Sequence, residues 1–140
     1  MILEHKHLIV RAEINQPPQN PTAMDEWMKH LVEDIRMKVL MGPYSVYSEM
    51  PGNQGLTSVT IIETSHIAVH VWDEVSPALM QMDVYSCSDF NPQLIFDRLH
   101  QDFAATKIEW KFLDRERGLE DISFSIPPFA QTNDYLNAIA

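Results

Sequence analysis

Hydrophobic and polar residues alternate along several short stretches of this 140-residue chain. A period of two is typical of a strand that buries one face and exposes the other. The clearest case is 66–72, where Ile67, Val69 and Val71 alternate with two histidines, an alanine and a tryptophan. The same alternation, with enrichment in β-branched residues, predicts strands over residues 7–14, 43–50, 56–64, 66–72, 79–87 and 107–113.

Two other segments show the spacing of helices. Thr22 and Asp25 form a capping box that predicts a helix over 25–40. Asn91 and Pro92 predict the start of a second helix, over 92–104. The expected apolar stripes comprise Trp27, Met28, Leu31, Val32, Ile35 and Val39 in the first helix, and Ile95, Leu99 and Phe103 in the second.

The predicted order is one strand, a helix, four strands, a helix and a last strand. Short antiparallel strands with two helices favour an α+β fold, a two-layer α/β sandwich whose antiparallel sheet is covered on one face by both helices. We expect residues 1–118 to form this single domain, and residues 119–140 an irregular tail that packs on it or on a neighbouring subunit. The other sheet face stays open, which favours a homodimer or higher homo-oligomer.

Charge and cysteine content narrow the classes of partner. The formal net charge is -10 with no block of Lys or Arg, which argues against nucleic acid or an anionic membrane. No apolar run approaches the ~18 residues of a membrane span, and the N-terminus lacks the pattern of a secretory signal. The single cysteine, Cys87, excludes an internal disulfide. We therefore expect a cytoplasmic protein.

Candidate chemistry gathers on the polar face of two predicted strands. Their antiparallel pairing would bring one set of side chains to a common surface beside Ser65, namely His66, His70, Asp83, Tyr85 and Cys87. These groups could be interface residues without chemistry. His66 and His70 lie roughly 13 Å apart on an extended strand, too far to share an ion, so no metal site is predicted. A Cys87–His70 nucleophilic pair would need an oxyanion hole, which the sequence does not identify.

The stretch GLTSVTIIETSHIAVHVWDE, followed by DVYSC, resembles the bacterial-type S-adenosylmethionine decarboxylases. The pattern of that family is Gly-x-Ser/Thr, a hydrophobic strand, Glu-Ser-His, x-x-x-His-x-Trp-x-Glu and then Asp-x-Phe-x-Cys-Gly. HKHLIVRAEI near the start and the later DRERG are similar to its opening strand and its late Arg-Gly segment. The similarity covers most of residues 5–118.

The resemblance implies a proenzyme that cleaves itself between Thr64 and Ser65. The Ser65 hydroxyl would attack the carbonyl of Thr64, and elimination would convert Ser65 into a pyruvoyl group, the cofactor. That ketone would accept electrons during decarboxylation of S-adenosylmethionine, a small-molecule substrate used for spermidine synthesis. Members of the family act as oligomers with sites at or near the subunit interface.

The same resemblance implies a role for each matching residue. His70 would remove the Cα proton of Ser65, Thr57 would assist the acyl shift, and Cys87 would protonate the decarboxylated carbon. The implied substrate-binding residues are Glu74, Trp72 and His66.

Several positions depart from the family pattern. Thr64 stands where the family has Glu, Asp73 where it has Pro and Ser88 where it has Gly, and the loop before Cys87 is about two residues longer. These departures keep two alternatives open. One is a non-processing homologue that keeps the fold for binding or assembly. The other is a pyruvoyl-dependent arginine or ornithine decarboxylase.

Overall fold

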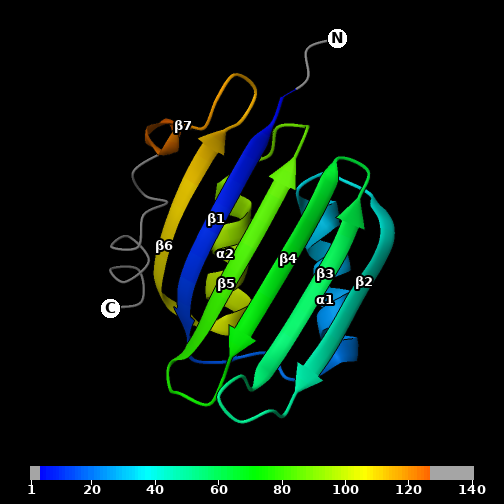
Figure 1. Ribbon diagram of the computed structural model, residues 1–140, viewed down its shortest axis with the longest axis vertical. Helices are drawn as coiled ribbons and strands as arrows, with labels where there is room; N and C mark the ends of the chain where they lie inside the picture. Colours follow the sequence, from blue (N-terminus) through cyan, green and yellow to red (C-terminus); the bar gives the residue numbers. More distant parts are fainter. Residues whose placement is uncertain (1–3, 127–140) are drawn as a thin grey trace.

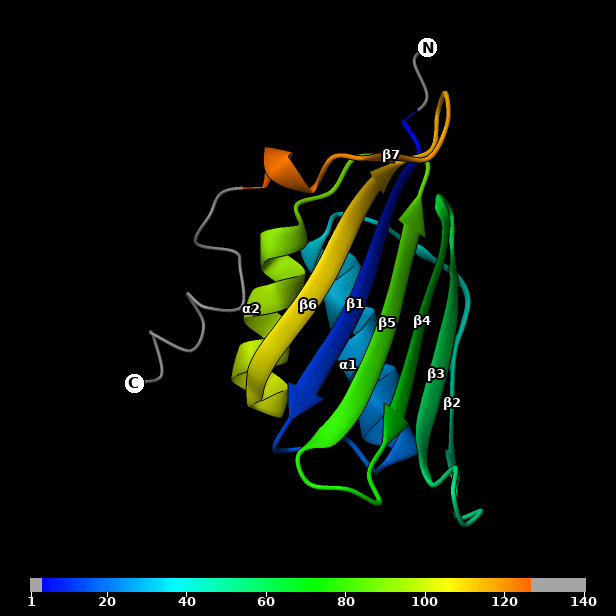
Figure 2. The ribbon, with the colours of Figure 1, turned by 60° about the vertical axis from the view of Figure 1, so that its left-hand side comes forward.

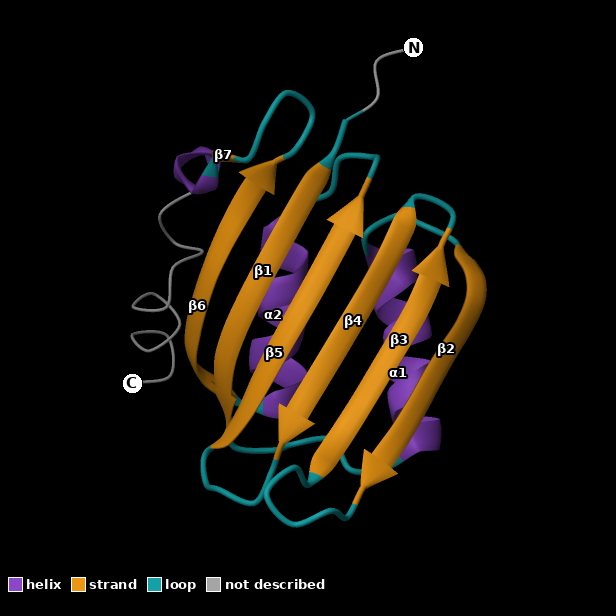
Figure 3. Ribbon diagram, viewed as in Figure 1, coloured by secondary structure: helices purple, strands orange, loops and turns teal. Residues whose placement is uncertain are grey.

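The computed structural model describes residues 4–126, which form a two-layer α/β sandwich (Figure 1). One layer is an antiparallel sheet with the strand order β2-β3-β4-β5-β1-β6-β7. The other layer consists of two helices on one face of the sheet, as Figures 2 and 3 show from different aspects. The predicted α+β architecture is confirmed. The helices are α1 (Pro21–Asp34) and α2 (Pro92–Phe103), and the strands are β1 (Lys6–Ile14), β2 (Val39–Ser48), β3 (Gly55–Ile62), β4 (Ser65–Trp72), β5 (Ala78–Ser86), β6 (Ala105–Asp114) and β7 (Glu120–Asp121).

The core lies between the sheet and the helices because apolar residues alternate along the central strands. Ile67 and Val69 of β4 are fully buried, while their neighbours His66 and His70 are exposed. The helices supply the facing side chains, including Met24, Met28 and Leu31 of α1 and Ile95, Phe96 and Leu99 of α2. Burial of one strand face leaves the polar set of β4 and β5 on the open face of the sheet.

The bounds predicted for the first helix are wrong at both ends. Asn20 rather than Thr22 caps α1, since Asn20 Oδ1 accepts the N–H of Ala23 at 3.0 Å. Pro21 occupies the first helical position, where no N–H is needed. The helix ends at Asp34, and Arg36 adopts a left-handed φ of 60° that turns the chain away. Val39, which we assigned to the helical stripe, therefore begins β2.

The second helix agrees with its prediction within one residue. Asn91 Oδ1 accepts the N–H of Gln93 at 3.1 Å, which confirms the predicted N-terminal cap. Ala104 closes the helix in the left-handed region, with φ 52°, and β6 starts at the next residue. The direct step from Ala104 into a strand explains why the last long strand begins earlier than predicted.

The predicted tail contains some regular structure. β7 pairs with the end of β6, and Ser123–Ser125 forms a short 3-10 helix. Ile122 and Ile126 pack against the core. The remainder of the predicted tail, 127–140, lies outside the described residues, and the domain boundary at 118 stays a prediction. No helix within residues 4–126 has the length and apolar character needed to cross a membrane.

The open face carries an apolar area on its β2–β3 side. We call it the β2–β3 patch, and its side chains are between 39% and 62% exposed: Met41, Tyr44, Val46, Val59 and Ile61. Strand pairing sets Val59 beside Ala68, and Val46 beside Thr57, so this patch continues onto the polar face of β4. Contiguous exposed apolar area of this kind is typical of an interaction surface.

Candidate active site

Ser65 lies at the start of β4, immediately after the tight turn that follows β3. Strand pairing joins Ile62 to Ser65, so Glu63 and Thr64 form a two-residue hairpin loop. Such loops normally place residues with positive φ inside the turn. Here neither loop residue has one, and Ser65 itself adopts a φ of 148°. A non-glycine residue in that region is strained, which marks the Thr64–Ser65 bond as unusual.

The carbonyl group of Thr64 is held from the neighbouring strand. Its oxygen accepts the main-chain N–H of Cys87 at 2.7 Å, one step beyond the last β4–β5 pair, Ser65 with Ser86. A hydrogen bond to a carbonyl oxygen draws electron density from its carbon and favours nucleophilic attack. The structure thus brings together three predicted residues: Thr64, Ser65 and Cys87.

Two further predicted site residues, Thr57 and His70, also contact each other. They are register partners on β3 and β4, and Thr57 Oγ1 lies 3.1 Å from His70 Nδ1. The His70 ring also packs against Trp72, with 6.0 Å between ring centroids. However, His70 follows Ser65 by five residues on an extended strand, which corresponds to roughly 16 Å. Within one chain, this pair therefore does not reach the Thr64–Ser65 bond.

Glu74 and Trp72 lie at the opposite end of β4 from Ser65. Both carboxylate oxygens of Glu74 accept main-chain N–H groups, from Gly52 at 3.1 Å and Gln54 at 3.0 Å. Trp72 Nε1 donates to Asn53 Oδ1 at 2.8 Å. The two predicted substrate-binding residues are thus engaged with the turn before β3, which they hold in place.

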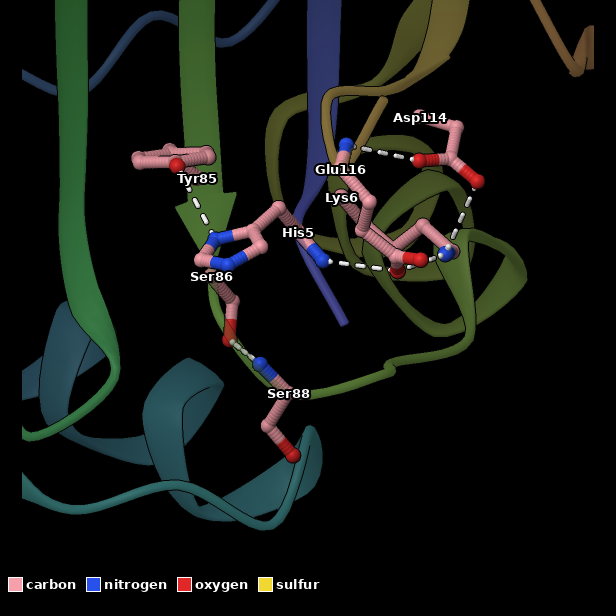
Figure 4. A network of polar contacts seen from close by, with 7 residues as sticks. All are labelled: His5, Lys6, Tyr85, Ser86, Ser88, Asp114 and Glu116. Atoms are coloured by element: carbon pink, nitrogen blue, oxygen red, sulfur yellow. Dashed lines mark hydrogen bonds and ion pairs between the residues drawn. The ribbon is translucent and has the colours of Figure 1, made fainter. Parts of the chain in front are cut away.

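His66, the third predicted substrate-binding residue, lies in an aromatic cluster around Tyr85. Its ring centroid is 5.6 Å from that of Tyr85, and the Arg115 guanidinium lies 4.2 Å over the same ring. The Tyr85 hydroxyl is 3.3 Å from His5 Nδ1 (Figure 4). His7 Nε2 contacts the carboxylate of Asp83 nearby. Aromatic rings and the Arg115 guanidinium therefore gather near the end of β5, the strand whose last residue pairs with Ser65.

Charged groups tie the ends of β1 and β6 together beside this cluster. Lys6 Nζ donates to Glu116 at 3.0 Å and to Asp114 at 3.4 Å, and the His5 N–H also donates to Glu116 (Figure 4). The Lys6 hydrogen bond lowers the pKa of Glu116 below its ordinary value. The main-chain N–H of Glu116 similarly lowers the pKa of Asp114. These contacts keep both carboxylates ionised.

A shallow hollow of about 500 Å³ lies on the open face. His70 and Asp83, two of the candidate residues, reach it, and other charged side chains complete much of its lining: Arg11, Glu109 and Lys111. Across residues 4–126, no three His, Cys, Asp or Glu side chains gather as a metal ion would require.

Sequence reasoning did not single out Arg115 or Ser86. Arg115 belongs to the DRERG segment, but its place over Tyr85 depends on how β6 returns beside β1. Ser86 lies between Tyr85 and Cys87 on the buried side of β5, where the alternation predicted an apolar residue. That break in alternation was the available signal for Ser86.

Comparison with known proteins identifies the family behind this geometry. The sequence model described as S-adenosylmethionine decarboxylase matches residues 7–116, which include every site residue above except His5 and Lys6. The chain belongs to the S-adenosylmethionine decarboxylase family. The resemblance noted in the sequence is therefore confirmed.

Curated relatives in this family are similar at modest identity. An S-adenosylmethionine decarboxylase proenzyme of Pyrobaculum islandicum is 39% identical over 64 residues, covering 45% of this chain and 50% of that protein. The proenzyme of Clostridium botulinum is 28% identical over 94 residues, covering 66% and 76%. That of Methanococcus vannielii is 33% identical over 70 residues, covering 49% and 54%. The chain thus spans about half the length of the first of these relatives.

Proposed function

We propose that this chain is a proenzyme that cleaves itself between Thr64 and Ser65 and then decarboxylates S-adenosylmethionine for spermidine synthesis. One observation carries the proposal: the Thr64 carbonyl is held by the Cys87 N–H at 2.7 Å, next to a serine with φ 148°. A polarised carbonyl and a strained backbone conformation at the next residue both favour an acyl shift. The family match to residues 7–116 supports the same reading.

Self-cleavage would begin with attack of Ser65 Oγ on the Thr64 carbonyl carbon. The new C–O bond replaces the C–N bond, and the hydroxyl proton ends on the Ser65 nitrogen, so an amide becomes an ester. Loss of the Ser65 Cα proton then breaks the Cβ–O bond and frees Thr64 as a carboxylate. Water completes the conversion by replacing the nitrogen with oxygen and releasing ammonia, which leaves a pyruvoyl group. That group supplies an electron sink for decarboxylation.

We further propose that two copies of the chain complete each site. His70 would remove the Ser65 Cα proton, with Thr57 holding its imidazole through the 3.1 Å contact. Roughly 16 Å of extended strand separates His70 from Ser65, so the imidazole would come from a second copy. A homodimer joined through open sheet faces would cover the β2–β3 patch and offer His70 of one copy to Ser65 of the other.

The remaining predicted residues would act on the substrate. The thiol of Cys87, whose main-chain N–H donates to the Thr64 carbonyl, would protonate the carbon that loses CO₂. Trp72 and His66 would contact the substrate, and Glu74 would hold the turn beside Trp72 while its carboxylate keeps further acceptor capacity. The net charge of -10 is compatible with a cationic sulfonium.

Separation of the purified chain on a denaturing gel, with mass spectrometry, tests the proposal. We expect two fragments that meet at Thr64 and Ser65, a carbonyl on the second that reacts with hydrazine, and no cleavage in Ser65→Ala. Ser88→Ala is the matched control and should still cleave, because Ser88 contributes its main-chain N–H to the nearby turn. A single uncut chain after long incubation would instead support a binding or assembly role.

Substrate identity needs a separate measurement. Carboxyl-labelled S-adenosylmethionine, arginine and ornithine would each be incubated with the cleaved protein. Release of labelled CO₂ from S-adenosylmethionine alone is the expected result. Release from arginine or ornithine would overturn the proposed substrate while keeping the self-cleavage.

A further inference from the structure

Ser86 is a buried polar residue at the end of a strand that is otherwise apolar on its inner face. Met80, Met82 and Val84 precede it on that face, and Ser86 is fully buried like Val84. A hydroxyl in such a place is costly unless it is hydrogen-bonded. Ser86 Oγ accepts the main-chain N–H of Ser88 at 3.0 Å, as Figure 4 shows. The hydroxyl therefore closes a small turn over Ser86–Ser88.

The turn contains the main-chain N–H that contacts Thr64. Cys87 is the middle residue of the turn, and its N–H donates at 2.7 Å to the carbonyl of Thr64, in the loop before β4. Ser65 and Ser86 are the last β4–β5 register pair, so regular sheet pairing ends just before this bond. The Ser86 side chain thus stabilises a contact that the sheet alone does not extend to.

We propose that the Ser86–Ser88 turn holds the Cys87 N–H as the donor to the oxyanion that forms on Thr64 during self-cleavage, with Ser86 as the positioning residue. The proposal rests on the self-cleavage proposed above and adds residues to that step. It gives a role to the main-chain N–H of Cys87 and to the buried hydroxyl of Ser86, and the sequence motif identified neither group.

The role follows from the electron flow of the acyl shift. When Ser65 Oγ bonds to the Thr64 carbon, the π electrons of the carbonyl move to its oxygen, which becomes negative. A hydrogen bond to an ionised acceptor is stronger than one to a neutral carbonyl, so the Cys87 N–H stabilises the transition state more than the ground state. The N–H keeps its own proton throughout. Loss of one such donor slows comparable reactions by about 100- to 1,000-fold.

Cleavage kinetics of three serine variants test the role of Ser86. Ser86→Ala should cleave at least about 10-fold more slowly than the parent, because the donor is loosened rather than removed. Ser86→Thr keeps the hydroxyl and should cleave faster than Ser86→Ala. The matched control is Ser58→Ala, which removes another fully buried hydroxyl, bonded to Ser45 at 2.8 Å, and should cleave at the parent rate. Equal slowing in Ser58→Ala and Ser86→Ala would reduce Ser86 to a general structural role.

An NMR measurement tests the same contact without any cleavage. In a Ser65→Ala background the chain stays intact, and ¹⁵N-cysteine labels one amide because Cys87 is the single cysteine. With ¹³C-carbonyl threonine, we expect a coupling across the Cys87–Thr64 hydrogen bond. Ser86→Ala should abolish or weaken this coupling, and Ser58→Ala should keep it. Retention of the full coupling in Ser86→Ala would overturn the positioning role whatever the parent chain does.

The two experiments separate the possible failures. If the parent chain cleaves and Ser86→Ala cleaves equally fast, the inference fails and the proposed function stands. If the parent chain never cleaves, the proposed function fails and the catalytic part of the inference falls with it. The NMR coupling then still decides whether Ser86 holds the contact.

Discussion

The two ends of strand β4 differ in what they can do within one chain. At its start, Ser65 is strained and its neighbouring carbonyl is already held by Cys87. Farther along the strand, His70 is hydrogen-bonded to Thr57 and packs on Trp72. It is too far from Ser65 of the same chain to contact it. Both groups of residues are held by β4. Because its backbone is extended, the strand also fixes the distance between them. A motif that is continuous in sequence is therefore split in space, and in the proposed function a second copy of the chain would complete it.

Mixing two inactive variants gives the largest expected effect. A His70→Ala chain keeps Ser65, and a Ser65→Ala chain keeps His70, so each should stay uncut alone. Co-expressed, they should restore cleavage of the His70→Ala chain only, in about half of its copies if the chains pair at random in twofold dimers. Size tags on the two variants allow a denaturing gel to identify which chain was cut.

Either of two results would contradict the split site. Normal cleavage of His70→Ala alone would remove His70 from the reaction. Continued absence of cleavage in a mixture that size-exclusion chromatography shows to contain mixed dimers would mean that Ser65 and His70 do not meet across copies.

A charge placed in the β2–β3 patch tests how the two copies would associate. Val59→Asp puts a carboxylate on the open face, where dimerisation would bury it at a cost of roughly 3 to 5 kcal/mol. We expect sedimentation to show monomers and the gel to show loss of cleavage. Leu94→Asp is the matched control, because Leu94 is 38% exposed against 39% for Val59 but lies on α2. Dimers in Val59→Asp would show that copies associate elsewhere.

Much of the fold was predictable because its signals are local. Alternation identified all the long strands, and Asn91 with Pro92 identified the start of α2. The start of the first helix was misplaced because the spacing of Thr22 and Asp25 indicated a capping box, whereas the chain uses Asn20 as its cap. The end of this helix depends on the left-handed conformation of Arg36. Arginine has no preference for that conformation, so the sequence did not indicate it.

The arrangement of the candidate site was predictable only in part. The strand rise that separates His66 from His70 applies equally to Ser65 and His70, so their separation followed from spacing already in the sequence. In contrast, the Cys87–Thr64 bond depends on where β5 ends, and the contacts of Glu74 with Gly52 and Gln54 join separate segments. Contacts of this kind arise only once the sheet is assembled.

Glu74→Gln should have a smaller effect, on stability rather than assembly. The change removes the negative charge that strengthens two hydrogen bonds to the turn before β3. We expect a loss of about 0.5 to 1.5 kcal/mol in the free energy of unfolding, measured by urea denaturation of an uncut Ser65→Ala chain. Glu33→Gln, on the exposed side of α1, should change it by less than about 0.5 kcal/mol. Equal values for both variants would show that Glu74 does not hold the turn.

Lys6→Met should give the smallest effect, a change in titration at the end of the sheet near Ser65. Because the Lys6 hydrogen bond is the main cause of the lowered pKa of Glu116, its removal should raise that pKa toward the ordinary 4.5. The pKa of Asp114 should move less, since the main-chain N–H of Glu116 remains as its largest cause. Carboxyl-carbon NMR titration of the uncut Ser65→Ala chain measures both.

The sign of the accompanying stability change follows from the direction of the shift. A carboxylate whose pKa is lowered in the folded state stabilises the fold above its unfolded pKa, and this stabilisation is lost as the pH falls through the folded pKa. The parent chain should therefore lose more stability than Lys6→Met as the pH falls below about 4.5, the ordinary pKa of Glu116. Identical acid denaturation of the two chains would mean that the Lys6 contacts do not stabilise this end of the sheet.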